Sequence, residues 1–162
     1  MSELSENKSG SAIPCRIFML WDSGWQNAPD WNKLCLESWK QFNPHHTVLA
    51  LDLEWAEELS EVKNYIDTEK WESASIQAKS DVLRVLLLWK FGGFWVDAST
   101  ACNRPLGDWV DDHRDFILFH RNDNHAKTLY AGFPLPWMAT WFMAAPNGSF
   151  VIEIIKDAVV KH

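Results

Sequence analysis

The residue types best able to bind a polar ligand come close together between positions 80 and 100 of this 162-residue chain. Asp81 and Arg84 are three residues apart, so in a helix they lie on one face, about one turn from each other. Asp97 follows a short apolar run that is typical of a buried strand. Taken alone, Asp81 and Arg84 are most simply an ordinary ion pair on a helix surface. Their position beside Gly92-Gly93 and Asp97 instead indicates one shared polar site.

Tryptophan is the other residue type that stands out, with 11 residues in the chain. Each indole brings a large apolar area and an N–H group that needs a partner when it is buried. We expect most of these rings to fill the core, and two or three to serve a site as flat platforms for a sugar ring or a nucleobase. Trp21 ends the first apolar run and precedes Asp22, so it lies where a ligand could meet it.

Apolar runs predict the strands, and helical spacing with capping residues predicts the helices. Strands are expected over residues 16–21, 47–51, 94–96, 116–119 and 138–144, and helices over 27–42 with Asn27 as the cap, over 74–91, and from 149 to 162. The first strand, helix and second strand make a βαβ unit, whose two strands run parallel. The predicted class is α/β, with a mostly parallel central sheet flanked by helices.

Ligands of open α/β sheets bind at the carboxyl ends of the strands. Three groups of residues directly follow expected strands: Trp21 with Asp22, then Asp52, then Asp97 with Ser99 and Thr100. We therefore expect them along one edge of the sheet, next to the helix that carries Asp81 and Arg84.

Composition narrows the classes of protein. The chain has 22 acidic and 15 basic residues, a formal net charge of −7 and no cluster of Lys and Arg, so no nucleic-acid partner is expected. Three scattered cysteines suit a reducing compartment, and the polar first residues do not resemble a secretory signal peptide. No apolar run approaches the ~20 residues of a membrane span, although peripheral membrane contact stays open. We expect a cytoplasmic protein with a disordered lead-in over 1–12 and one domain over 13–162.

Two blocks of the sequence carry a resemblance to a known group, namely Ser80-Asp81-Val82-Leu83-Arg84 and Gly92-Gly93-Phe94-Trp95-Val96-Asp97-Ala98-Ser99. They are similar to the SD-x-x-R and GG-x-aromatic-x-D-x-D segments of sugar-nucleotide glycosyltransferases of the GT-A fold, which include the glycosyltransferases with a DXD sugar-binding motif. The form that ends in Ala98-Ser99 resembles the capsular polysaccharide synthesis proteins. The resemblance covers residues 13–109 well. It implies a GT-A-like (Rossmann-like) nucleotide-sugar-binding domain, with this chain as the N-terminal part of a longer family domain.

The resemblance implies a catalytic group of Asp97, Asp81 and Arg84. In related enzymes the aspartate and arginine of the helix hold the hydroxyls of the donor sugar and the diphosphate. Carboxylates accept hydrogen bonds from hydroxyls and guanidinium groups donate to phosphate oxygens, so these residue types suit those roles. Asp97 would contact the ribose and a divalent metal, Mn²⁺ or Mg²⁺, which bridges the diphosphate.

The substrate-binding residues implied by the resemblance are Trp21, Ser80, Gly93, Trp95, Asp97 and Ser99. Trp21 would stack on the base of the donor, and Trp95 would line the nucleoside pocket. Ser99 stands where the related motif has its second aspartate. Because a neutral hydroxyl is a weaker metal ligand than a carboxylate, we expect metal affinity to fall unless another residue supplies the charge.

These observations predict a glycosyltransferase that moves a sugar from a nucleotide-diphosphate donor, with a UDP-sugar favoured, to a saccharide acceptor in capsular or surface polysaccharide biosynthesis. An alternative is a non-catalytic module that binds a nucleotide sugar or a carbohydrate, suggested by Ser99. A third and weaker alternative is a structural α/β interaction protein, because resemblance in fold and motif does not establish a complete site.

Overall fold

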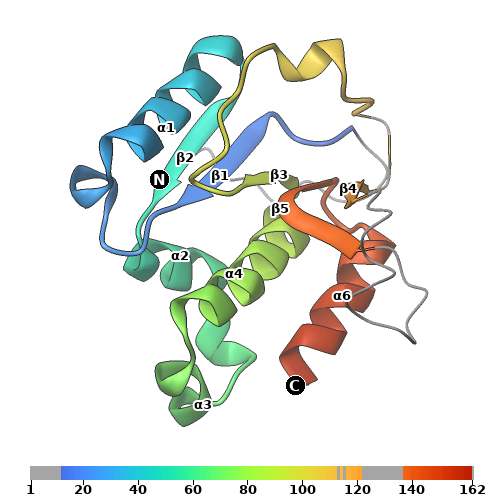
Figure 1. Cartoon of the computed structure of the whole chain (residues 1–162). Coiled ribbons are helices and arrows are strands. Elements are labelled where there is room, and N and C mark those ends of the chain that lie inside the picture. The colour runs from blue at the N-terminus through green and yellow to red at the C-terminus, as the bar shows by residue number, and fades with distance from the viewer. Residues whose placement is uncertain (1–11, 113, 115, 122–136, 162) are drawn as a thin grey trace, which may run out of the picture.

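Five strands form one mixed sheet in the order β2–β1–β3–β5–β4 in the computed structural model, which describes residues 12–112, 114, 116–121 and 137–161 (Figure 1). The strands are β1 (Arg16–Leu20), β2 (Thr47–Leu51), β3 (Gly93–Val96), β4 (Ile117–Arg121) and β5 (Trp137–Ala145). β1 pairs in parallel with β2 and β3, whereas β5 is antiparallel to both of its neighbours. The prediction of a mostly parallel sheet is therefore confirmed for four strands, and β5 runs against them.

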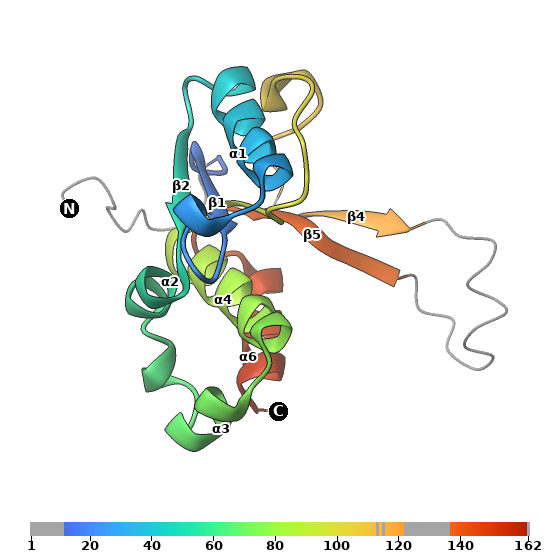
Figure 2. The same ribbon diagram turned by 60° about the vertical axis from the view of Figure 1, so that its left-hand side comes forward.

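Helices cover both faces of this sheet, as Figure 2 shows from the side. On one face lies α1 (Asp30–Phe42), and on the other lie α2 (Leu53–Ser60), α4 (Ile76–Phe91) and α6 (Phe150–Lys161), with the short α3 (Thr68–Ser73) beside them. Each face has its own apolar cluster. Phe18, Leu86 and Trp95 belong to the α4 side, and Phe94 and Phe142 to the α1 side.

Helix α4 carries the central motif, and its ends follow from local capping. The Ser75 hydroxyl accepts a hydrogen bond from the backbone N–H of Ala78, so the helix begins at Ile76 rather than at residue 74. Gly92 ends it with φ of 65°, a conformation that costs glycine little. The second half of α4 is buried from Leu83 to Leu88, because the sheet and two helices surround it.

The expected start of the first helix was wrong. Asn27 ends a 3₁₀ turn over Trp25–Asn27, and α1 begins at Asp30 after Pro29. Proline is tolerated at this point because the first N–H groups of a helix have no partner within the helix. The predicted lead-in over 1–12 lies outside the described residues except for residue 12.

A register shift interrupts the pairing of β4 with β5. Leu118 lies opposite Met143, but the next residue, Phe119, lies opposite Ala139. Residues 140–142 of β5 therefore have no partner on β4, although Phe142 still pairs with Val96 of β3. Irregular pairing of this kind is common near functional sites. Among the helices that the structure describes, none is both long and apolar enough to cross a membrane.

Candidate functional site

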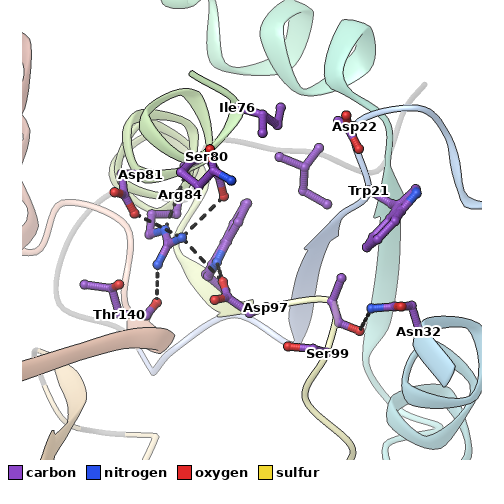
Figure 3. A pocket seen from close by; sticks show the side chains of 14 residues that line it. Trp21, Asp22, Asn32, Ile76, Ser80, Asp81, Arg84, Asp97, Ser99 and Thr140 are labelled. Carbon is purple, nitrogen blue, oxygen red and sulfur yellow. Dashed lines mark hydrogen bonds and ion pairs between the residues drawn. The ribbon is translucent and has the colours of Figure 1, made fainter. Parts of the chain in front are cut away.

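A cavity of about 530 Å³ opens beyond the carboxyl ends of β1 and β3, beside the first turns of α4. We call it the polar cavity. It is lined by Leu20, Trp21, Asp22, Asn32, Ile76, Gln77, Ser80, Asp81, Arg84, Trp95, Asp97, Ala98, Ser99 and Thr140 (Figure 3). Its volume lies within the ~300–1,000 Å³ of typical small-molecule sites. All the predicted site residues except Gly93 line it.

Asp97 is held in a defined orientation at the end of β3. Its backbone N–H donates to the carbonyl of Trp141 at 2.8 Å, which fixes the main chain to β5. Its Oδ1 accepts a hydrogen bond from Trp95 Nε1 at 2.9 Å and lies 3.4 Å from Arg84 Nη2. Among the described residues no partner of Oδ2 is found, and the side chain is 35% exposed. One carboxylate oxygen is thus used for positioning, and the other is left to meet a ligand.

Arg84 is a buried cation with its donors directed at the protein. Nε donates to the Ser80 carbonyl at 3.3 Å, Nη1 to the Thr140 carbonyl at 2.6 Å and Nη2 to Ser80 Oγ at 3.3 Å. Nη2 also lies 3.1 Å from Asp81 Oδ1. The simple ion pair with Asp81 is therefore present, but as one part of a network that reaches Asp97 and β5. This network positions Asp97, and the contact of Arg84 with a diphosphate stays a prediction.

Two tryptophans contribute to the polar cavity in different ways. Trp95 is 1% exposed, and its ring lies under the Arg84 guanidinium with 5.3 Å between guanidinium carbon and ring centroid. Such a cation–π contact stabilises the buried charge. Trp21 is only half-buried and lies across the cavity from Arg84 and Asp97 (Figure 3). Trp21 is therefore the ring placed to meet a ligand, whereas Trp95 supports Asp97 from below.

Gly93, which was predicted among the substrate-binding residues, lies outside the polar cavity at the other end of β3. Its φ is 107°, and an added Cβ would meet the Arg16 backbone oxygen at 2.7 Å. Glycine is needed here because β1 and β3 approach closely at this point.

Asn32 and Thr140 belong to the polar cavity but were not among the predicted residues. Asn32 Nδ2 donates to the Ala98 carbonyl at 3.2 Å and so holds the segment after Asp97 against α1. Asparagine has a low helix propensity, and its occurrence within α1 was the sequence signal that could have indicated a special role. Thr140 acts through its backbone carbonyl, for which residue type gives no signal.

The charges of the polar cavity bear on the metal that the resemblance implies. Its lining holds the carboxylates of Asp22, Asp81 and Asp97 and one guanidinium, so an anionic diphosphate would meet a net negative surface. Mg²⁺ and Mn²⁺ are commonly bound by one or two carboxylates together with substrate phosphates. Among the described residues no group of three His, Cys, Asp or Glu side chains could hold a metal ion by itself. The donor set therefore fits an ion shared with a phosphate-bearing ligand and bound through Asp97.

The chain is similar to two fungal glycosyltransferases. The glycosyltransferase afumC of Aspergillus fumigatus is 31% identical over 101 residues, which are 56% of this chain and 26% of that protein. The O-glycosyltransferase braB of Annulohypoxylon truncatum is 27% identical over 155 residues, or 85% of this chain and 35% of that protein. The chain thus spans about a quarter to a third of the length of these relatives.

The structure of the PaToxG glycosyltransferase is similar in fold. It aligns with a TM-score of 0.66 and 18% identity over 93% of this chain and 61% of that chain. The family model described as capsular polysaccharide synthesis protein matches residues 2–162. The chain is therefore a member of the capsular polysaccharide synthesis protein family.

Proposed function

We propose that this chain binds a nucleotide-diphosphate sugar, with a UDP-sugar favoured, in the polar cavity and takes part in the transfer of the sugar to a saccharide acceptor. The observation that carries the proposal is the arrangement of Asp97. Its carboxylate is fixed by Trp95 and Arg84, keeps one oxygen without a partner among the described residues and faces Trp21 across the cavity. The family and the glycosyltransferase relatives support the class of reaction.

The residues divide the work by chemistry. Trp21 offers a ring face for the base of the donor. The exposed carboxylate of Asp81, at the rim of the polar cavity, accepts hydrogen bonds from hydroxyls of the donor sugar. As the bond from the anomeric carbon to the phosphate oxygen breaks, the nucleoside diphosphate leaves with the bonding electrons. The anomeric carbon bonds the acceptor oxygen, and the acceptor proton passes to solvent. Asp81 and Asp97 stabilise the positive charge that develops on the sugar ring.

A bound Mn²⁺ or Mg²⁺ would neutralise charge on the leaving diphosphate. Asp97 would hold it through its free oxygen, with Ser99 as a neutral neighbour on the same loop. Because only one carboxylate follows β3, we propose that this ion binds tightly only together with the donor.

Asp97→Asn tests the proposal because the amide oxygen still accepts hydrogen bonds from Trp95 and Arg84 while the charge is lost. A panel of UDP-, GDP- and dTDP-sugars with Mn²⁺ or Mg²⁺ is screened by thermal shift, since a ligand that binds only the native state raises the Tm. Hydrolysis and transfer are then measured with the donor that binds. Turnover should fall about 100-fold or more in Asp97→Asn and stay unchanged in the exposed control Asp108→Asn. Full turnover in Asp97→Asn would show that this site is not the catalytic one.

The second candidate is a module that binds a nucleotide sugar without turnover. Ser99 favours it, because the loop after β3 then lacks a second carboxylate for the metal. Calorimetry with the same donors, with and without Mn²⁺, separates the two functions. Donor binding with no hydrolysis or transfer under any metal would identify the module.

A further inference from the structure

A second cavity of about 220 Å³ lies beside the polar cavity and is built mainly of aromatic rings. We call it the aromatic cavity. Its rings are Trp39, Trp109, Phe119, Trp141 and Phe142, and Arg104 is also part of its lining. The two cavities share a boundary along the chain. Ser99 and Thr140 line the polar cavity, and the residues that follow them, Thr100 and Trp141, line the aromatic one.

The rings form a floor and an exposed platform. Trp39 and Phe142 are buried at 2% and 0% exposure, with 6.2 Å between their centroids. Phe119 and Trp141 stack with centroids 4.9 Å apart and planes 7° from parallel, yet they keep 37% and 39% of their surface exposed. Trp141 and Phe142, which are adjacent in β5, both line this cavity, next to the point where the pairing of β4 with β5 shifts. A stacked pair of large rings left open to solvent beside a cavity marks a place for a ligand rather than ordinary core packing.

The size and chemistry of the aromatic cavity limit what it can hold. Its volume is below the ~300–1,000 Å³ of sites for drug-sized ligands, so it suits one ring. A pyranose has C–H faces that pack on aromatic rings and hydroxyls around its edge that need polar partners. Arg104 supplies donors at the rim, with its guanidinium carbon 5.8 Å from the Trp109 centroid. A nucleobase gains less than a pyranose from the donors of Arg104, and Trp21 already offers the base a ring in the polar cavity.

We infer that the aromatic cavity is the acceptor subsite and binds one pyranose ring of a saccharide next to the donor. This inference rests on the proposed function for its role in transfer, but the binding itself does not require a donor. The backbone hydrogen bond from the Asp97 N–H to the Trp141 carbonyl, at 2.8 Å, joins the residue that carries the carboxylate to the strand that carries the platform. The acceptor ring would thus lie next to the polar cavity, because Trp141 follows Thr140 on β5 and Thr100 follows Ser99 on the loop after β3.

The test measures saccharide binding and donor binding separately. Methyl glycosides of glucose, galactose and mannose, with maltose and cellobiose, are titrated into the full chain without nucleotide and followed by tryptophan fluorescence and saturation-transfer NMR. Trp141→Ala should weaken the saccharide that binds about 3- to 10-fold, and Arg104→Gln about 3-fold, with the Kd of the nucleotide sugar changed less than about twofold. Trp55→Ala is the matched control, because Trp55 is also 39% exposed and lies outside both cavities.

The outcomes distinguish this inference from the proposed function. Trp141→Phe keeps a ring on the platform and should retain most of the saccharide affinity. It replaces Trp141→Ala in the test if the alanine variant does not fold. Unchanged saccharide affinity in both Trp141→Ala and Arg104→Gln, an equal loss in Trp55→Ala, or binding of aryl alcohols such as 4-nitrophenol in place of every saccharide would overturn the inference. Absence of any nucleotide-sugar binding, with saccharide binding still dependent on Trp141, would instead refute the proposed function alone.

Discussion

Replacing Trp95 with phenylalanine removes one hydrogen bond from Asp97 and leaves the rest of the site in place. The indole Nε1 donates to Asp97 Oδ1 at 2.9 Å, and a phenyl ring has no such donor. Phenylalanine still offers a ring under the Arg84 guanidinium, so the buried cation keeps part of its cation–π contact. The variant therefore asks whether Asp97 must be held by its neighbours in order to act.

The size of the effect follows from the exposure of the acceptor. A hydrogen bond to a charged group contributes about 1.5–3 kcal/mol, and water around the one-third exposed carboxylate replaces part of that. We expect a loss of about 1–2 kcal/mol in the transition state, which is a fall of roughly 5- to 30-fold in kcat/KM. Because Trp95 is fully buried, the smaller ring also leaves a cavity that costs about 1–3 kcal/mol of unfolding free energy.

Trp71→Phe is the control that separates these two losses. Trp71 is 2% exposed, belongs to the same apolar cluster and donates from Nε1 to Glu57 Oε1 at 2.9 Å, but it lies outside the polar cavity. Both variants should lose similar stability in urea unfolding, while only Trp95→Phe should lose activity per folded molecule in a nucleotide-sugar hydrolysis assay. Equal activity in the two variants would refute the idea that Trp95 positions Asp97.

Three further perturbations probe the metal, the backbone and the pH response. Ser99→Asp restores a second carboxylate and should raise the apparent affinity for Mn²⁺ about tenfold in a metal titration of turnover, whereas Ser99→Asn should not; equal affinities would argue against a metal at this loop. Gly93→Ala should lower the unfolding free energy by about 1–3 kcal/mol, because φ is 107° and an added Cβ would clash with the Arg16 backbone. Activity per folded molecule should be unchanged. An unchanged Tm would contradict the close approach of the strands. Burial, and to a lesser extent the charge of His45, lower the pKa of His46. As the pH falls below about 6.5, the unfolded chain therefore binds a proton at His46 before the folded chain does, and the free energy of unfolding should decrease. Urea unfolding between pH 5 and 8 should show this slope weakened in His46→Gln, and an identical slope in that variant would assign the effect to other groups.

The parts of the fold that local sequence determines were predicted well. The five residues of β2 were predicted with their observed bounds, Thr47–Leu51, because Asp52 caps the next helix and stops the strand. The end of α4 at Phe91 was predicted from Gly92, which takes a conformation that other residues rarely adopt. These are interactions between near neighbours, and they do not depend on the rest of the chain.

Apart from the start of α1, which was predicted at Asn27 and lies at Asp30, the parts that were missed depend on pairing between distant segments. No periodicity of residues 138–144 indicates that β5 runs antiparallel to β3, or that its pairing with β4 shifts. Arg84 was expected to face a ligand, but its partner on β5 is a backbone carbonyl 56 residues away. A carbonyl has no sequence signature. The helix motif could therefore identify the cation, but not whether it acts on a ligand or on Asp97.

Strand β5 is the element on which both cavities depend, and this links their chemistry. The Thr140 carbonyl holds Arg84, which in turn lies against Asp97, and the Trp141 carbonyl holds the backbone of Asp97 itself. The Trp141 ring then forms part of the platform of the aromatic cavity. A shift of residues 140 and 141 would move the carboxylate and the platform together, because these two adjacent residues carry both sets of contacts. Side-chain substitutions at Trp141 leave these carbonyls in place and should separate the two sites, whereas a deletion within residues 140–142 should disable both at once.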